Sequence, residues 1–244
     1  MLAAALLLSL ALLAVVTVAT RRPPAHALPD FDAYLQRWSA AHDGYDARPT
    51  RVLRGWLHLM YRGARPLAAT GVLPDVLTGW AVWLALAAVA AAAHGTLWLL
   101  LAAVLIVASG FGDGLDGAVA VLTDRATAWG YVLDSLADRV TETLFLVAAW
   151  VAGAPTWLTV ATGIAIGLLE YLRARAGNAG AAPAAVITVG ERPQRVICCA
   201  IAVGLAGLVP ARATAAAGWS AAILLALTMV GLAQLTLGVH RMLR

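Results

Sequence analysis

The chain has 244 residues, of which 62% are apolar and 12% are charged, and its mean hydropathy is +0.83. Because soluble domains carry about 25% charged residues, this composition excludes a disordered chain and argues against a soluble enzyme. The net charge is +4, and all 17 basic residues are arginine. In so apolar a chain, the basic surplus indicates cytoplasmic loops near anionic lipid headgroups and argues against a nucleic-acid partner.

The first segment, residues 1–20, is an uncharged apolar run that is followed by Arg21 and Arg22. Residues 25–27 (Ala-His-Ala) resemble a signal-peptide cleavage site, so a cleaved signal-like segment is one interpretation. The start of the chain lacks a basic residue, however, whereas the two arginines follow the apolar run. The positive-inside rule then places residue 21 in the cytoplasm, which favours an N-terminal membrane anchor.

Residues 21–70 are the most polar stretch, with eight arginines and four aspartates. Between Leu53 and Leu67, apolar residues recur at helical spacing among arginines, which predicts an interfacial amphipathic helix ahead of the membrane core. Glycine and proline interrupt this pattern, so a partly disordered basic linker is the alternative.

Six apolar segments follow in residues 71–244, which we take as one domain. A segment that faces lipid must satisfy its own backbone hydrogen bonds, so apolar runs of this length predict helices. The predicted spans are 76–93, 95–112, 130–152, 156–172, 196–211 and 218–239. The fold class is therefore all-α integral membrane: a six-helix transmembrane core with an extra N-terminal anchor helix and an interfacial amphipathic helix.

The arginines also predict the orientation of these spans. With residues 21–70 in the cytoplasm, every arginine except Arg212 lies on the cytoplasmic side or at the cytoplasmic end of a span. The alanine- and arginine-rich, lysine-free composition is typical of a GC-rich bacterial genome. We therefore expect a protein of the bacterial cytoplasmic membrane.

Four aspartates in residues 112–143 form two pairs. Asp113 and Asp116 are three residues apart at the end of the second span, and Asp134 and Asp138 are four apart at the start of the third. Each pair therefore lies on one helical face. The 17 residues between Asp116 and Asp134 allow two antiparallel neighbouring helices, so the four carboxylates are expected to converge at one membrane edge. Asp124, beside Arg125, is interpreted as an ordinary loop or capping residue.

Four carboxylates at close quarters near hydrocarbon require cations to stay ionised. Oxygen ligands suit hard divalent ions, and two Mg²⁺ or Mn²⁺ ions per site would neutralise the four charges. Mg²⁺ ordinarily keeps coordination positions open for water and substrate phosphates. The pattern therefore indicates phosphoryl or pyrophosphate chemistry, with the active site on the cytoplasmic side.

The string Asp113-x-x-Asp116-Gly117-x-x-Ala120, followed by Gly130-x-x-x-Asp134-x-x-x-Asp138, resembles the signature of the CDP-alcohol phosphatidyltransferases. Pro74 and Thr78 also resemble the pattern of that family. The resemblance implies transfer of a phosphatidyl group from CDP-diacylglycerol to the hydroxyl of a small alcohol, with release of CMP, in phospholipid biosynthesis. It also implies a homodimer.

By the same resemblance, Asp113, Asp116 and Asp134 would be the main metal ligands. Asp138 would be the general base, with a possible contact to a metal. The residues expected to pack against the CDP moiety are Gly117, Ala120 and Gly130.

The family pattern has arginine at the position of Val121. Arg125 lies one turn later and would reach the same face and contact the CDP diphosphate if the helix continues.

A basic group follows the fourth span and opens the fifth. Arginine binds phosphate bidentately, so these residues predict an acceptor-phosphate site and favour a phosphorylated polyol such as inositol phosphate or glycerol phosphate. The alternative is ordinary positive-inside flanking. The residues are Arg173, Arg175, Arg192 and Arg195.

Two other functions stay open from the sequence alone. A divalent-cation transporter also uses intramembrane acids, although it predicts them near the bilayer midplane on broken helices. A catalytically silent family member is the second, because Val121 departs from the family pattern.

Overall fold

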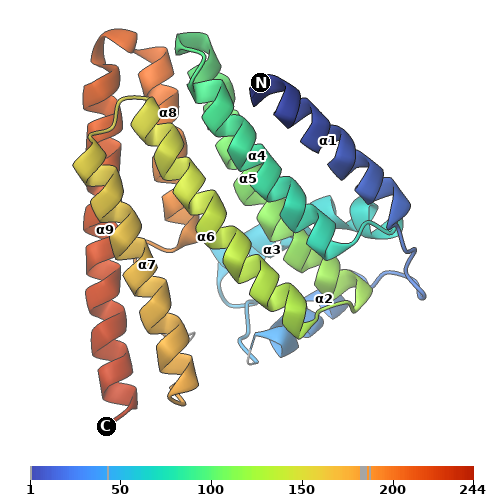
Figure 1. Cartoon of the computed structure of the whole chain (residues 1–244). Coiled ribbons are helices and arrows are strands. Elements are labelled where there is room, and N and C mark those ends of the chain that lie inside the picture. The colour runs from blue at the N-terminus through green and yellow to red at the C-terminus, as the bar shows by residue number, and fades with distance from the viewer. Residues whose placement is uncertain (1, 43, 182–185, 187) are drawn as a thin grey trace. The chain divides into compact units, whose positions relative to one another are not determined.

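A computed structural model of the chain describes every residue except 1, 43, 182–185 and 187, and all regular elements in the described part are helices (Figure 1). This confirms the all-α prediction. The six core helices follow the predicted order. The elements are α1 (Leu2–Ala19), α2 (Phe31–Ala41), α3 (Arg51–Ala69), α4 (Pro74–Ala92), α5 (Thr96–Thr123), α6 (Ala128–Val151), α7 (Thr156–Asn178), α8 (Arg192–Leu208), a 3-10 turn (Pro210–Arg212) and α9 (Ala213–Met242).

Two features differ from the sequence-based expectation. Helix α5 runs to Thr123 instead of ending at residue 112, so the first aspartate pair lies inside a helix and not at its end. Helix α2 was not expected. It begins at the N-cap Asp30, whose carboxylate accepts a hydrogen bond of 2.9 Å from the backbone N–H of Ala33.

Three of the described helical segments are long and apolar enough to cross a membrane. They are α4, α5 and the segment Pro210–Met242. Helix α6 carries four charged residues between Asp134 and Glu142, and α8 has only 17 residues. The apolar helices indicate an integral membrane protein.

The chain forms two compact units, and α4, α5 and α6 each contribute residues to both. The first unit comprises Met1–Trp83 and Ser109–Asp138, and the second comprises Leu84–Ala108 and Arg139–Arg244. In the second unit, α9 packs along α7 and α8.

In the first unit, α1 is docked against α4 by two indole hydrogen bonds. Trp80 Nε1 donates to Thr17 Oγ1 at 2.9 Å, and Trp83 Nε1 donates to Ser9 Oγ at 3.1 Å. Hydrogen bonds between side chains help membrane helices to associate in one particular arrangement, because apolar contacts between helices are no stronger than contacts with lipid.

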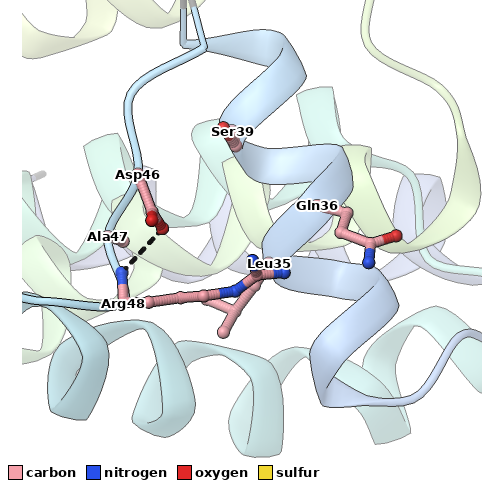
Figure 2. Close-up of a pocket in the computed structure, with 6 residues that line it drawn as sticks. All are labelled: Leu35, Gln36, Ser39, Asp46, Ala47 and Arg48. Carbon is pink, nitrogen blue, oxygen red and sulfur yellow. Dashed lines mark hydrogen bonds between the residues drawn. The ribbon is translucent and has the colours of Figure 1, made fainter.

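Helix α3 is amphipathic, as the sequence predicts. Its buried residues are Leu57, Met60, Tyr61, Ala64 and Ala68, whereas its arginines are exposed. Tyr34 and Leu35 of α2 pack into the same core. A cavity of about 310 Å³ lies between α2 and the segment that follows it, lined by Leu35, Gln36, Ser39, Asp46, Ala47 and Arg48 (Figure 2).

The turn between α3 and α4 depends on a glycine. Gly71 has a φ of +78°, and a Cβ added there would lie 2.6 Å from the carbonyl carbon of Arg22. Its carbonyl also accepts a hydrogen bond of 2.8 Å from the Arg22 N–H. Only glycine combines this backbone conformation with so close an approach.

We expect Gly71→Ala to destabilise the protein by about 1–3 kcal/mol or more, because it adds backbone strain and a clash at once. Thermal unfolding in detergent measures the effect. Gly55→Ala is the matched control, since a Cβ at that helical position meets nothing within 4 Å, and it is expected to leave stability unchanged or slightly raised. Equal melting temperatures for the two variants would contradict the tight turn.

Candidate active site

The C-terminal half of α5 holds Asp113 and Asp116 in a glycine-rich stretch that remains helical. The glycines there allow close packing within the first unit. A Cβ on Gly112 would lie 3.6 Å from the Cβ of Ala81, and one on Gly114 would lie 2.7 Å from the sulfur of Met60. Helices α3 and α4 therefore pack directly beside the aspartate pair, which offsets the low helix propensity of glycine.

The central prediction from the sequence concerns the convergence of the two aspartate pairs. Asp113 and Asp116 of α5 and Asp134 of α6 each offer one carboxylate oxygen, and these three oxygens lie within 4.8 Å of one another. Asp116 is buried, whereas the other two are half-buried. The structure thus brings three of the four predicted residues together. Asp138 lies one turn further along α6 and is half-buried.

Asp116 is held in place by two hydrogen bonds. Thr78 Oγ1 of α4 donates to Asp116 Oδ2 at 2.5 Å, and the N–H of Gly117 donates to Oδ1 at 2.6 Å. Thr78 is itself 5% exposed. Sequence reasoning noted Thr78 only as part of a pattern, and its contact with Asp116, 38 residues away, depends on the tertiary fold.

The donor set fits a hard divalent cation. Three carboxylates supply oxygen ligands only, and no histidine or cysteine belongs to the group among the described residues. Mg²⁺ and Mn²⁺ prefer such ligands. The bonds from Thr78 and Gly117 orient one of the carboxylates, as hydrogen bonds commonly do for metal ligands.

The glycines predicted to contact the CDP moiety differ in their surroundings. Gly117 is exposed, and a Cβ there would meet nothing within 4 Å, which leaves open space beside Asp116. A Cβ on Gly130 would lie 3.2 Å from Thr127 Oγ1 and 3.7 Å from Asp75 Oδ1. Ala120 is half-buried.

Arg125 was expected to reach the face of Asp113 and Asp116 if the helix continued to it. Helix α5 does not continue that far. The helix ends at Thr123, Asp124 has a φ of +56°, and the N–H of Arg125 donates to the carbonyl of Ala120 at 2.9 Å. This is a Schellman-type end, which confirms Asp124 as a capping residue. The guanidinium of Arg125 donates to the carbonyl of Pro23 at 3.2 Å.

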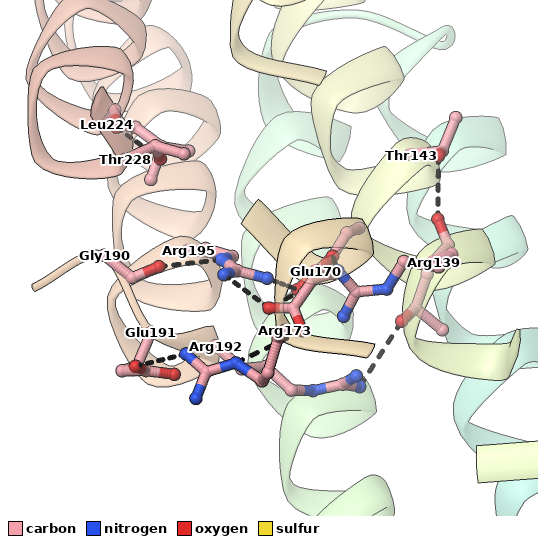
Figure 3. Close-up of polar contacts among 12 residues, drawn as sticks. Arg139, Thr143, Glu170, Arg173, Gly190, Glu191, Arg192, Arg195, Leu224 and Thr228 are labelled. Carbon is pink, nitrogen blue, oxygen red and sulfur yellow. Dashed lines mark hydrogen bonds and ion pairs between the residues drawn. The ribbon is translucent and has the colours of Figure 1, made fainter. Parts of the chain in front are cut away.

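The predicted acceptor-site arginines lie in the second unit and differ in exposure. Arg175 is exposed, Arg173 and Arg192 are half-buried, and Arg195 is 1% exposed. Figure 3 shows Arg173, Arg192 and Arg195 among glutamate side chains. Arg175 and Arg173 are at least partly exposed, whereas Arg195 is enclosed. In Arg192, Nε and Nη1 are buried and Nη2 donates to Thr141 Oγ1 at 3.3 Å.

Comparison with known proteins identifies the class. The family model described as CDP-alcohol phosphatidyltransferase matches residues 71–237, which is more than half of the chain. The chain therefore belongs to the CDP-alcohol phosphatidyltransferase family, a class of transferases of phospholipid biosynthesis. Membership sets aside the cation-transporter alternative.

Two similar proteins share one name, archaetidylinositol phosphate synthase. The chain is 38% identical over 134 residues to archaetidylinositol phosphate synthase from Methanothermobacter thermautotrophicus, covering 54% of this chain and 67% of that protein. It is 34% identical over 99 residues to the protein of the same name from Pyrococcus horikoshii, covering 40% of this chain and 52% of that one. The match thus spans about half the length of the second relative.

Solved structures share the fold. Mycobacterium tuberculosis phosphatidylinositol phosphate synthase in complex with manganese and citrate superposes with a TM-score of 0.58 at 24% identity, covering 74% of this chain and 88% of that one. A structure of the same enzyme with CDP-DAG bound gives a TM-score of 0.56 at 24% identity, covering 75% and 94%.

We expect Thr78→Val to weaken Mn²⁺ binding about 10- to 100-fold, because the isosteric change removes the hydroxyl that orients Asp116. Thr78→Ser keeps the hydroxyl and is expected to bind Mn²⁺ nearly as the unmodified protein does. Electron paramagnetic resonance titration of the purified protein with Mn²⁺ measures both. If valine and serine variants bind Mn²⁺ equally well, Thr78 does not position the ligand.

Proposed function

We propose that this protein transfers the phosphatidyl group of a CDP-activated lipid, such as CDP-diacylglycerol, to the hydroxyl of inositol phosphate and releases CMP. The observation that carries the proposal is the convergence of Asp113, Asp116 and Asp134 within a family signature. The names of the similar curated proteins favour inositol phosphate over glycerol phosphate as the acceptor.

The proposal includes two divalent cations per site, Mg²⁺ or Mn²⁺. Asp113, Asp116 and Asp134 would hold them, with Asp138 completing the second set. The cations would neutralise the charge that develops on the diphosphate during transfer.

The reaction then needs a base and a binding surface from the chain. Asp138 accepts the proton of the acceptor hydroxyl, and the hydroxyl oxygen forms a bond to the β-phosphorus of the CDP-lipid. The bond from that phosphorus to the bridging oxygen breaks, and CMP leaves with the electron pair. Gly117, Ala120 and Gly130 pack against the cytidine, and the absence of side chains on the two glycines admits the nucleotide.

The acceptor phosphate requires cations that it can reach. The proposed phosphate ligands are Arg173, Arg175 and Arg192. The first two are at least partly exposed, whereas Arg192 would have to exchange its contact with Thr141 for the phosphate. Arg125 is retained as a candidate for the CDP diphosphate, although its guanidinium contact to Pro23 would have to be exchanged for it.

The proposal assigns roles to the remaining segments. Residues 1–20 are the anchor, residues 21–70 are the cytoplasmic basic segment with the interfacial helix, and residues 71–244 are the catalytic domain. The protein works as a homodimer in the bacterial cytoplasmic membrane, with its site on the cytoplasmic side. The archaeal sources of the similar curated proteins make CDP-archaeol a second donor to test.

An acceptor panel tests the activity. Purified protein with Mg²⁺ or Mn²⁺ is incubated with CDP-diacylglycerol or CDP-archaeol and with inositol phosphate, glycerol phosphate, inositol or serine. CMP release is assayed, and the lipid product is identified by mass spectrometry. We expect CMP with inositol phosphate and none without metal. Absence of CMP with every donor and acceptor would support a catalytically silent member, the alternative that Val121 raises.

Asp138→Asn is expected to lower kcat by about 10²- to 10⁴-fold, because the amide cannot accept the proton, while Mn²⁺ binding by Asp113, Asp116 and Asp134 is kept. Asp113→Asn is the comparison variant and is expected to lose both turnover and Mn²⁺ binding. Turnover assays are paired with the same Mn²⁺ titration. Unchanged turnover in Asp138→Asn would remove the assignment of the base.

A further inference from the structure

A network of six charged side chains occupies the second unit. Its centre is Arg195, in the first turn of α8, which is 1% exposed. Three of its nitrogens donate to protein acceptors (Figure 3). Nε donates to the carbonyl of Gly190 at 2.8 Å, Nη1 to Glu142 Oε1 at 2.7 Å and Nη2 to Glu170 Oε1 at 2.8 Å. Arg195 thus links α6, α7 and α8.

The same glutamates also hold arginines that are more exposed. Arg139 Nη1 lies 2.9 Å from Glu142 Oε2, and Arg173 Nε lies 3.7 Å from Glu170 Oε2. The side chains of Arg139 and Arg173 are 32% and 23% exposed, against 1% for Arg195. The network therefore has an enclosed arginine at its centre and two accessible arginines at its rim.

Glu191 completes the arrangement ahead of α8. Its Oε1 accepts a bond of 2.9 Å from Arg173 Nη2 and further bonds from the N–H and hydroxyl of Thr188. The three arginines at positions 139, 173 and 195 and the three glutamates at 142, 170 and 191 balance in charge.

The pairing of these charges determines how each substitution in the network is expected to affect stability. Glu142 is 3% exposed, so removal of Arg195 alone leaves a buried carboxylate with one partner fewer. Breaking one side of a buried ion pair is strongly destabilising, whereas replacing both sides by neutral groups is often tolerated. A residue that acts only through its partners is therefore distinguishable from one that binds the substrate.

We propose that Arg195, clamped between Glu142 and Glu170, is a positioning residue that fixes Arg173 for the acceptor phosphate and does not itself contact the substrate. This inference rests on the proposed function for its kinetic part only. It departs from the sequence-based expectation that Arg195 is a phosphate ligand, because the side chain is enclosed and its donors face protein oxygens.

The test compares Arg195→Met with the charge-balanced variant Arg195→Met/Glu142→Gln. Arg195→Met is expected to lower the melting temperature clearly and to raise KM for inositol phosphate about tenfold, with a smaller change in kcat. The double variant is expected to regain most of the melting temperature but to keep the raised KM, because Glu170, which also contacts Arg173, still lacks Arg195 as a partner. Arg173→Met is expected to raise KM with little loss of melting temperature, and Arg241→Met, an exposed site on α9, is the control.

Two outcomes overturn the inference. If Arg195→Met raises KM for inositol phosphate as much in an Arg173→Met background as in the unmodified protein, Arg195 acts on the phosphate independently of Arg173. If Arg195→Met leaves the melting temperature unchanged, the clamp does not exist. Where Arg195→Met does not yield folded protein, Arg195→Lys, which keeps the charge but loses the forked contacts to two glutamates, replaces it in the comparison with Arg173→Met. If the unmodified protein releases no CMP, the proposed function fails, but the melting temperatures of the four variants still decide the clamp.

Discussion

The repulsion among close carboxylates is the constraint on which the site depends. Three acidic oxygens within 4.8 Å, one of them on a buried side chain, cannot remain ionised beside apolar helices without a compensating positive charge. The surrounding residues keep the three carboxylates close together despite this repulsion. Thr78 and the N–H of Gly117 fix Asp116 in the arrangement that a cation with oxygen ligands requires. The stability cost of the cluster is therefore best explained by function.

Helix α3, which precedes the residues matched by the family model, supports the aspartate pair of α5 within the first unit. The family model begins at residue 71, whereas α3 ends at Ala69. Met60 of α3 nonetheless packs against Gly114, between Asp113 and Asp116, and a Cβ on Gly63 would lie 2.9 Å from a methyl group of Leu115. Helix α3 thus braces the stretch of α5 that carries the first aspartate pair. Its exposed arginines suit the anionic surface of a membrane.

The sequence predicted features that depend on local spacing. The three- and four-residue intervals of the aspartate pairs define one helical face each, and their convergence is confirmed for Asp113, Asp116 and Asp134. The order of the six core helices is also confirmed, because apolar length is a strong local signal. Helix α2 was missed, although Asp30 and the residues Phe31, Tyr34, Leu35 and Trp38 carried a cap and a helical period.

Other features follow from tertiary contacts and have no local signature. The predicted span ended at residue 112, but α5 continues to Thr123, with Ala81 and Met60 packed against Gly112 and Gly114. The partners of Arg195 lie 25 and 53 residues away in the chain. The positions of the arginines in the sequence therefore could not show that Arg195 is enclosed while Arg173 and Arg175 are at least partly exposed.

The location of a bound ion tests the central claim most directly. Crystals of the full chain soaked in Mn²⁺ and measured at the manganese absorption edge would give anomalous peaks. The account predicts at least one peak within coordination distance, about 2.1 Å, of carboxylate oxygens from Asp113, Asp116 and Asp134. Manganese bound elsewhere, with none at these three aspartates, would contradict it.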